Sequence, residues 1–247
     1  MRAKGALPLR VVCWNIHKGI GGVDRRYRLE RVVDVLRDVD ADLALLQEVD
    51  DGAPRSRRDR QVDRLADELG LEHRAFHPNH FLKEGCYGNA ILSRWPLDHV
   101  ENLDLTIPLK KKRGSLHARL TVTDGKRRAR VWVHDVHLGL AGFERKVQLR
   151  RILKWQDRHR CPRDTAVLIG GDLNDVWGNL GAQVLEPAGY HGLATRPYTF
   201  PAARPLRPLD ALFVRGPAKI TRGRTWTRPP ATEASDHLPL VVSLRVR

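Results

Sequence analysis

The chain has 247 residues, and 41% of them are hydrophobic, which is enough for a substantial core and excludes a globally disordered chain. Its 44 lysines and arginines exceed its 29 aspartates and glutamates, giving a formal net charge of +15. This charge favours polyanionic partners such as nucleic acid, anionic phospholipid or phosphorylated metabolites. It can equally reflect a compositional bias on a solvated surface, because net charge bears on association and not on chemistry.

The cysteine spacing and the hydropathy of the chain predict its compartment. Cys13, Cys86 and Cys161 are far apart, odd in number and without a metal-binding spacing, as expected of reduced thiols in a cytoplasmic protein. The first residues lack an apolar signal core, and no window approaches the roughly 18 apolar residues of a membrane span. We therefore expect a cytoplasmic protein without a transmembrane segment, and a monomer by default.

The first half of the chain alternates strand and helix patterns. Residues 9–15 predict a strand that ends in Asn15, and a glycine-rich turn follows it. Apolar residues at helical spacing predict a helix over about 27–39, before a buried strand over 42–47. The remaining elements of this half are an arginine-rich loop, a helix, a strand and a turn, expected at 52–63, about 62–69, 89–93 and 94–96. A further strand is expected after that turn.

The second half predicts mainly strands. Asp124-Gly125 is a strong hairpin signal, and it joins the expected strands 115–123 and 128–137. The other expected elements are a basic loop, an amphipathic helix, a surface loop and two closing strands, over 110–114, 143–158, 192–208, 209–214 and 238–246. Many strands with few helices predict two packed sheets with helices outside. We expect one domain over 1–247, with its core from about residue 9.

The segment Ala166–Asp175 organises the chain. Four apolar residues predict a buried strand, and two glycines allow a tight turn that presents Asp172, Asn174 and Asp175. Carboxylate and amide oxygens in alternation suit a hard cation or an activated water molecule. An Asx-rich turn that caps the next helix would explain the same residues. This segment alone does not decide between the two.

Polar residues also occur at the ends of other predicted strands. These residues are Asn15, Glu48, His137, Asp172, Asn174, Asp210, Asp236 and His237. Taken singly, Glu48 is consistent with a surface carboxylate and His137 with a hydrogen-bonded strand histidine. Asp210 lies among apolar residues and would be costly to bury without a partner, for which His237 is the natural candidate. If the strands lie side by side, these side chains converge on one cleft.

Six motifs in this order resemble the endonuclease/exonuclease/phosphatase superfamily. They are Val11–His17, Leu46–Val49, Tyr87–Ser93, Val136–Gly139, Gly171–Asn174 and Ser235–Pro239. The resemblance implies a four-layer α/β sandwich of the deoxyribonuclease I type, with two mixed sheets packed face to face. It also implies Mg²⁺ or Mn²⁺ dependence and cleavage of a phosphate ester at the rim of the sheets.

The resemblance assigns roles to the residues at the strand ends. Glu48 matches the principal metal carboxylate, with Asn15 beside it, and Asp236 matches a further carboxylate on the metal side. Asp172 matches the residue that orients or deprotonates the attacking water, and Asn174 matches a neighbour that contacts metal or phosphate. His237, oriented by Asp210, matches a histidine that polarises the phosphate or assists acid–base chemistry. His137 matches a contact to the phosphate in the transition state.

The match has departures and additions. Val136 stands where many members have threonine, and His17 stands where some nucleases have an acid, so the match does not support a second metal at residue 17. Arg113 resembles a phosphate-contacting arginine of part of the family, although a basic loop is usually just solvated, and Asn89 is a further candidate for the substrate phosphate. The run Asn15–Gly19 resembles that of a bacterial subgroup with an Asn-Ile-His-Lys-Gly motif.

We therefore expect a Mg²⁺-dependent phosphohydrolase, and specifically a phosphodiesterase acting on nucleic acid. Residues 55–64, 110–113 and 126–130 are the expected contacts to the nucleic-acid backbone. The alternative is the same chemistry on a phospholipid or a phosphorylated small molecule, since fold does not fix substrate. A catalytically inactive binding protein is the third hypothesis, but it has no need to retain the five residues Glu48, Asp172, Asn174, Asp210 and His237.

Overall fold

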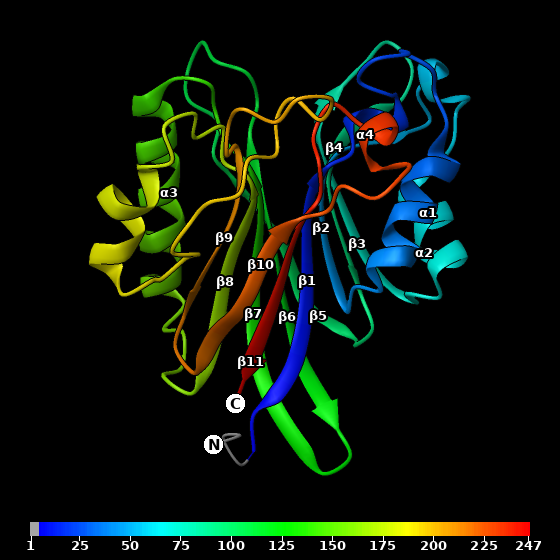
Figure 1. Ribbon diagram of the computed structural model, residues 1–247. Coiled ribbons are helices and arrows are strands. Elements are labelled where there is room, and N and C mark those ends of the chain that lie inside the picture. The colour runs from blue at the N-terminus through cyan, green and yellow to red at the C-terminus, as the bar shows by residue number, and fades with distance from the viewer. Residues whose placement is uncertain (1–4) are drawn as a thin grey trace.

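The structure of the protein, a computed structural model, describes residues 5–247 and contains a six-stranded and a five-stranded sheet (Figure 1). The first sheet has the order β10-β11-β1-β2-β4-β3, and the second has the order β5-β6-β7-β8-β9. The strands are β1 Leu7–Asn15, β2 Leu43–Asp51, β3 His73–Phe81, β4 Cys86–Ser93, β5 Leu97–Asp104, β6 Gly114–Asp124, β7 Arg127–His137, β8 Thr165–Asp172, β9 Asp210–Arg215, β10 Ala218–Thr225 and β11 Leu240–Val246.

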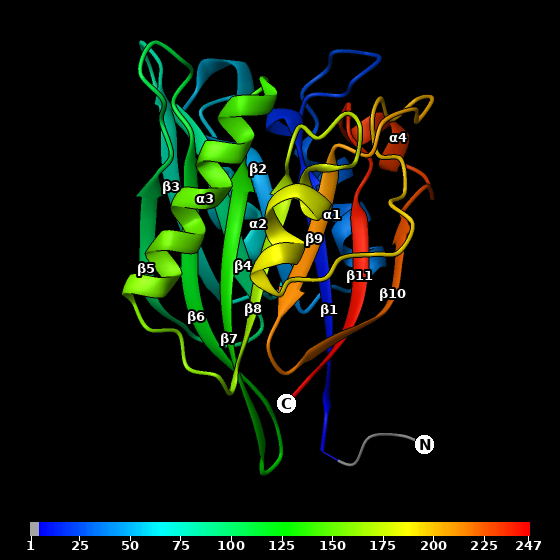
Figure 2. The same ribbon diagram turned by 90° about the vertical axis from the view of Figure 1, so that its left-hand side faces the viewer.

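Helices cover the outer face of each sheet. Helices α1 (Leu29–Val39) and α2 (Gln61–Leu69) lie on the first sheet, and α3 (Gly142–Arg158) lies across the second (Figure 2). The short helices are η1 His17–Gly19, η2 Pro54–Ser56, η3 Gly181–Leu185, η4 Glu186–Ala188 and α4 Ala231–Ala234. The predicted four-layer α/β sandwich is therefore confirmed. Among the described residues, no helix combines the length and apolar character that crossing a membrane requires.

Strand β1 shows how the sequence specifies these layers. Side chains alternate between the two faces of a strand, so successive apolar residues can serve two different cores. Val11 and Cys13 lie in the core between the sheets, whereas Val12 and Trp14 lie in the core beneath α1. All four are fully buried, which explains why this strand reads as a continuous apolar run. A third core lies between the second sheet and α3.

Strand direction places the polar strand ends together. The pairs β1–β2 and β7–β8 are parallel, and the other neighbouring pairs are antiparallel. Strands β1, β2, β7 and β8 all end at the edge that is uppermost in Figure 1. Because the two sheets pack face to face, residues at the ends of β1 and β8 meet across the seam between them. The predicted convergence of strand ends is therefore confirmed.

Two strands, β3 and β10, were not predicted from the sequence. Both lie at an edge of the first sheet, where one side of the strand needs no partner. Strand β3 contains Pro78 and β10 contains Gly223, and each pairs with an irregularity in register. Edge strands tolerate proline, glycine and bulges, so their sequences lack the apolar alternation that identifies the central strands.

Candidate active site

Asp172, the last residue of β8, lies at the centre of the site and is 2% exposed. Gly171 precedes it with φ +130°, and a Cβ there would lie 2.2 Å from the carbonyl oxygen of Val136. Only glycine therefore fits the turn that presents the carboxylate. The Oδ1 atom of Asp172 accepts a hydrogen bond from the backbone N–H of Asn174 at 2.9 Å. The Oδ2 atom of Asp172 accepts one from Nδ2 of Asn15 at 3.1 Å.

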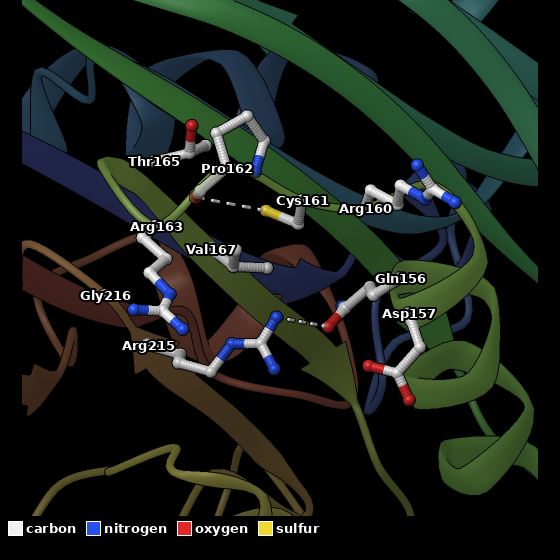
Figure 3. Close-up of a pocket in the computed structure, with 10 residues that line it drawn as sticks. All are labelled: Gln156, Asp157, Arg160, Cys161, Pro162, Arg163, Thr165, Val167, Arg215 and Gly216. Carbon is white, nitrogen blue, oxygen red and sulfur yellow. Dashed lines mark hydrogen bonds between the residues drawn. The ribbon is translucent and has the colours of Figure 1, made fainter.

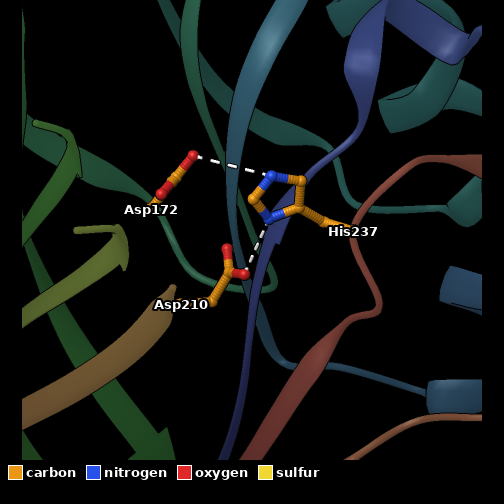
Figure 4. Close-up of side chains that lie close together, drawn as sticks. All are labelled: Asp172, Asp210 and His237. Carbon is orange, nitrogen blue, oxygen red and sulfur yellow. Dashed lines mark hydrogen bonds and ion pairs between the residues drawn. The ribbon is translucent and has the colours of Figure 1, made fainter. Parts of the chain in front are cut away.

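A histidine lies between Asp172 and a second carboxylate (Figure 4). Asp210 pairs with Asp172 in the register of β8 and β9, and its Oδ2 lies 2.8 Å from Nδ1 of His237. Nε2 of His237 lies 3.9 Å from Oδ2 of Asp172. Burial alone would lower the pKa of His237, but Asp210 and Asp172 outweigh it and raise that pKa to about 10. At neutral pH the ring is an imidazolium, and Nδ1 donates to Asp210.

A second imidazole faces the same oxygen of Asp172. Nε2 of His137, the last residue of β7, lies 3.4 Å from Oδ2 of Asp172. Burial lowers the pKa of His137 well below its ordinary value, and the nearby Arg113 lowers it further. His137 is therefore neutral while His237 is charged. Two imidazoles with different protonation states thus meet at one carboxylate, an arrangement typical of acid–base sites.

Glu48 is aimed into the site by a bulge in β2. The register between β2 and β4 shifts between Leu46 and Val49, and Glu48 has φ +56°. Its Oε2 accepts a hydrogen bond from Nζ of Lys18, and its side chain is 19% exposed. Burial acts to raise the pKa of Glu48, but the charge and hydrogen bond of the Lys18 ammonium outweigh it, and the pKa is lowered to about 2. Glu48 is therefore an ionised carboxylate that already faces a cation.

The predicted ligands Asn15 and Asp236 lie at the same edge. Asn15 is 3% exposed, pairs with Gln47 beside Glu48, and accepts the backbone N–H of His17 at 3.0 Å through Oδ1. The Asp236 side chain is 31% exposed, and its Oδ1 lies 3.9 Å from Nδ1 of His17. His17 thus lies between Asn15 and Asp236, and its backbone N–H donates to Asn15.

The structure brings one group of possible metal ligands together, and the predicted ligands form a second set with suitable donor chemistry. Asp172, Asp210 and His237 place possible ligand atoms within 4.8 Å of one another. Nδ1 of His237 is already bonded to Asp210, however, and a protonated imidazole is not a metal ligand. Glu48, Asn15 and Asp236 offer oxygen atoms, which hard cations such as Mg²⁺ prefer, and Glu48 is ionised. The residues at this edge therefore fit a divalent cation of the predicted kind.

Arg113 is buried, although it was expected to be part of a solvated basic loop. Lys110, Lys111 and Lys112 are exposed, but Arg113 is only 8% exposed at the start of β6. Burial lowers its pKa, whereas Asp172 and then Glu48 act to raise it. Within residues 5–247 no carboxylate oxygen lies within 4.0 Å of its guanidinium, and its Nε has no hydrogen-bond partner. A buried guanidinium with free donors can receive an anion.

Asn89 is bound to the protein, and it lies beside two residues that the sequence analysis missed. Its Nδ2 donates to the carbonyl oxygen of Asp135 at 3.1 Å, and its Oδ1 accepts from Asn79. Gln47 donates to Oδ1 of Asp135 at 2.5 Å, and burial raises the pKa of Asp135 well above its ordinary value. These contacts join β2, β4 and β7 beneath the site. A role for Asn89 in phosphate binding stays a prediction.

The segment 192–208 is not simply the surface loop that was predicted. Thr199 is fully buried, and its Oγ1 accepts the backbone N–H of Asp210 at 3.3 Å. The ring of Phe200 lies 4.9 Å from that of His237. The segment therefore covers the Asp210–His237 pair. Its proline and arginine content gives no indication of this role, because Thr199 and Phe200 make these contacts.

Two of the three predicted basic clusters offer little free positive charge to a substrate at this site. Within residues 55–64, Arg55, Arg58, Arg60 and Arg64 each have a carboxylate partner within 4.0 Å. Residues 126–130 lie at the tip of the β6–β7 hairpin, at the opposite end of the sheet (Figure 1). The cluster at 110–113 lies at the end that holds Asp172, and the loop that begins the 55–64 cluster follows β2 at this same end. The net charge of the chain therefore overestimates how many basic side chains are free to contact a substrate near Asp172.

The comparisons with known proteins agree with this fold. The model of the Endonuclease/Exonuclease/phosphatase family matches residues 12–237. The Escherichia coli (strain K12) protein YbhP is 31% identical over 258 residues, which covers 96% of each chain. The chain belongs to the endonuclease/exonuclease/phosphatase family. Its fold is that of a phosphoesterase family, and its relationship to YbhP extends over nearly the whole chain.

Solved structures show the same fold. An endonuclease/exonuclease/phosphatase from Beutenbergia cavernae superposes with a TM-score of 0.77 at 24% identity, covering 97% of this chain and 72% of that one. Danio rerio TDP2, complexed with a single-strand DNA product, has a TM-score of 0.69 at 19% identity over 96% and 98% of the two chains. A mannosyl-6-phosphatase from Bacteroides thetaiotaomicron has a TM-score of 0.73 at 13% identity over 96% and 99%. At these identities the likeness concerns the fold alone.

Proposed function

We propose that this protein is a divalent-metal-dependent phosphodiesterase that hydrolyses nucleic acid by attack of a water molecule. One observation carries the proposal: Nε2 of His137 and Nε2 of His237 face the same oxygen of Asp172, beside the buried Arg113. A carboxylate that can take a proton thereby lies next to three groups that can stabilise negative charge. Phosphoryl transfer needs this combination, because charge develops on the non-bridging oxygens as water attacks.

In this proposal each residue has a defined task. Asp172 holds and deprotonates the water through Oδ2, while Asn15 and the backbone of Asn174 keep its carboxylate in place. Asp210 keeps His237 protonated, so that Nε2 can donate to a phosphate oxygen or to the leaving group. The guanidinium of Arg113 and the neutral imidazole of His137 contact the remaining phosphate oxygens.

Glu48 would hold the cation, with Asn15 and Asp236 as further oxygen ligands. A divalent metal bound there supplies Lewis-acid stabilisation of the phosphate charge. The Lys18 ammonium, which now contacts Glu48, would have to move aside. Oxygen ligands and an ionised carboxylate favour Mg²⁺ or Mn²⁺ over softer metals.

Three findings support nucleic acid as the substrate. The exposed Lys110, Lys111 and Lys112 lie on the loop that leads to Arg113, where they can contact a phosphate backbone. Aromatic side chains at the same end are exposed, and bases can stack on them: Phe81 is 70% and Trp177 is 82% exposed. The fold also resembles that of a protein solved with a single-strand DNA product.

A phosphate ester presented at a lipid surface is a second candidate, because aliphatic side chains are also exposed around the site. Within residues 5–247, every exposed large hydrophobic side chain except Val100 and Val147 lies on segments at the end that holds Asp172. The residues are Val23, Phe81, Leu82, Leu109, Leu140, Phe143, Trp177, Tyr198 and Leu206. Leucines offer no stacking surface to bases, but they can enter the interface of a membrane.

The test measures hydrolysis of an aryl phosphodiester, an aryl phosphomonoester, single- and double-stranded DNA, and phospholipid vesicles. Each substrate is supplied with Mg²⁺, with Mn²⁺ or with EDTA. Glu48→Ala and His237→Ala are compared with Glu72→Ala and His99→Ala, which remove exposed side chains of the same types. We expect metal-dependent cleavage of DNA that falls at least about a hundredfold in the two site variants and is unchanged in the two controls.

Other outcomes would redirect or reject the proposal. Cleavage of vesicles or of the monoester without cleavage of DNA would keep the site and replace the substrate. Equal losses in the site variants and their matched controls would show that the assigned residues are not the active site. Turnover that persists in EDTA would remove the metal from the proposal.

A further inference from the structure

A cavity of about 410 Å³ lies at the opposite end of β8 from Asp172 (Figure 3). Thr165, the first residue of β8, and Gly216, which follows β9, contribute to its wall, together with the segment after α3. Seven residue steps along a strand, at about 3.3 Å each, separate Thr165 from Asp172 by about 23 Å. The cavity is therefore separate from the candidate active site, although both involve β8.

The cavity wall carries an excess of positive charge. Arg160, Arg163 and Arg215 line it, against the single carboxylate of Asp157. Within the described residues, none of these arginines has a carboxylate oxygen within 4.0 Å, although many arginines elsewhere in the chain do. Figure 3 shows Arg163 and Arg215 on the same side of the cavity, with Arg160 pointing away from them. Three guanidinium groups against one carboxylate leave an excess of two positive charges on the cavity wall.

Arg215 is held in place without being neutralised. Its guanidinium lies 4.9 Å from the ring centroid of Tyr190, and it donates to Oε1 of Gln156 at 3.2 Å. The same Oε1 accepts the hydroxyl of Tyr190 at 2.5 Å, and Gln156 is only 1% exposed. Arg196 is a useful contrast, because its guanidinium pairs with the buried Asp175 at 2.5 Å. A positioned guanidinium whose partners are all uncharged retains donors for an anion.

We propose that this cavity is a second anion site, which binds a phosphate group away from the active site. A phosphate dianion can accept charge-assisted hydrogen bonds from Arg163 and Arg215 together, and the cavity volume suits a small ligand. A neighbouring cavity of about 540 Å³ is also lined in part by Arg128 and by Arg130, although Arg130 is paired there with Asp164. The phosphate belongs either to a soluble phosphorylated molecule or to a lipid head group. The site does not depend on the catalytic proposal.

The experiment uses inorganic phosphate as the probe, titrated by calorimetry at constant ionic strength. All proteins carry Arg113→Gln, which removes an anion contact at the candidate active site. In this parent, Arg163→Gln with Arg215→Gln is compared with Arg158→Gln, an exposed arginine of α3 that does not line the cavity. We expect the paired substitution to weaken phosphate binding by at least about tenfold and the control to leave it unchanged.

Each other result also decides the question. Absence of phosphate binding by the parent, or equal weakening by Arg158→Gln, would overturn the proposal. Because Arg215 packs on Tyr190, its substitution can loosen the fold, so Arg163→Gln alone is tested in parallel. Its side chain is exposed, and its effect on binding is interpretable once circular dichroism shows an intact fold. Unchanged phosphate binding by Arg163→Gln and by a folded paired variant would again overturn the proposal.

A second arm identifies the source of the phosphate. The parent is sedimented with vesicles of phosphatidylcholine alone and of phosphatidylcholine with phosphatidic acid. Retention by phosphatidic acid that the paired substitution abolishes indicates a lipid head group. Binding of free phosphate without retention on either vesicle indicates a soluble ligand. Binding of neither phosphate nor vesicles would overturn the site.

Discussion

His237 and Asp210 form a buried ion pair in which Nδ1 donates to Oδ2 at 2.8 Å. The residues are 27 positions apart, yet each is at most 4% exposed, so the pair is hidden from solvent. A buried imidazolium is stable only beside such a partner, since burial opposes the charge. The protonation of His237, and with it the acid–base chemistry of the site, therefore depends on Asp210.

We predict that Asp210→Asn makes stability less dependent on pH in the alkaline range. The folded pKa of His237, about 10, lies above its unfolded value, so its stabilisation is complete below about pH 6.5 and is lost as pH rises through 10. Wild-type stability should thus fall by up to about 1.4 kcal/mol per pH unit over this range. Urea unfolding at pH 6, 8 and 10 measures it. Parallel profiles for wild type and variant would contradict the prediction.

The buried histidines beneath α3 should make the fold less stable at acidic pH. Burial lowers the pKa of His117 to about 3 and the pKa of His134 well below its ordinary value, so both are neutral when folded. The unfolded chain gains protons below about pH 6.5, and stability is lost from there toward the folded pKa values. At pH 5 this amounts to about 2 kcal/mol for His117, and His134 contributes in the same direction.

The measurement compares unfolding by urea at pH 7 and pH 5 in the wild type, His117→Gln and His99→Gln. His99 is exposed and provides the control. We expect His117→Gln to lose less stability on acidification than the wild type, whatever its stability at pH 7. If His117→Gln lost as much stability between pH 7 and pH 5 as His99→Gln, His117 would not be the cause of the effect.

Lys18→Met should strengthen the binding of Mg²⁺. The ammonium of Lys18 contacts the Glu48 carboxylate that is expected to bind the metal, so cation and lysine compete for the same oxygen. Removing a charge-assisted contact of this kind should tighten binding by about tenfold. Calorimetry with Mg²⁺ on Lys18→Met, Glu48→Gln and wild type tests this. Weaker binding by Lys18→Met would instead mean that the lysine supports the metal site.

Gly171→Ala should destabilise the fold much more than Gly125→Ala. Both glycines have positive φ, at +130° and +59°, but a Cβ at Gly171 would lie 2.2 Å from a backbone oxygen and one at Gly125 would meet nothing within 4 Å. We expect a loss of about 3 kcal/mol or more at Gly171 and about 1–2 kcal/mol at the Gly125 hairpin. Thermal unfolding of the two variants measures the difference, and similar losses would refute the steric explanation.

The sequence analysis succeeded where local pattern and burial coincide. Strand β8 reads as an apolar run that ends in glycines. The polar strand ends, together with the family resemblance, group Asp172, Asp210 and His237 in one site, and the structure brings these three side chains together. It failed at β3 and β10, because edge strands carry little apolar pattern. It also missed Thr199, Gln47 and Asp135. Their roles arise from contacts between distant segments, for which no local pattern exists.

The basic clusters show a second limit of the sequence. Arg55 and Arg127 belong to similar runs of positive charge, yet one lies beside the buried Asp50 and the other at a distant hairpin. Arg113 was grouped with three solvated lysines, although it alone is buried at the site. Composition counts charges but does not locate them, and ion pairing is decided by tertiary structure.

Neither sheet holds a complete site: Asn15 and Glu48 belong to the first, whereas His137, Asp172 and Asp210 belong to the second. Their spacing is therefore set by the packing between the sheets. A Cβ at Gly170 would lie 2.8 Å from Sγ of Cys13 on the facing strand, so even one methyl group has no room there. Small changes of volume in this core should misalign the two halves of the site. Substitutions of core residues between the sheets are therefore expected to lower the turnover rate, although these residues never touch the substrate.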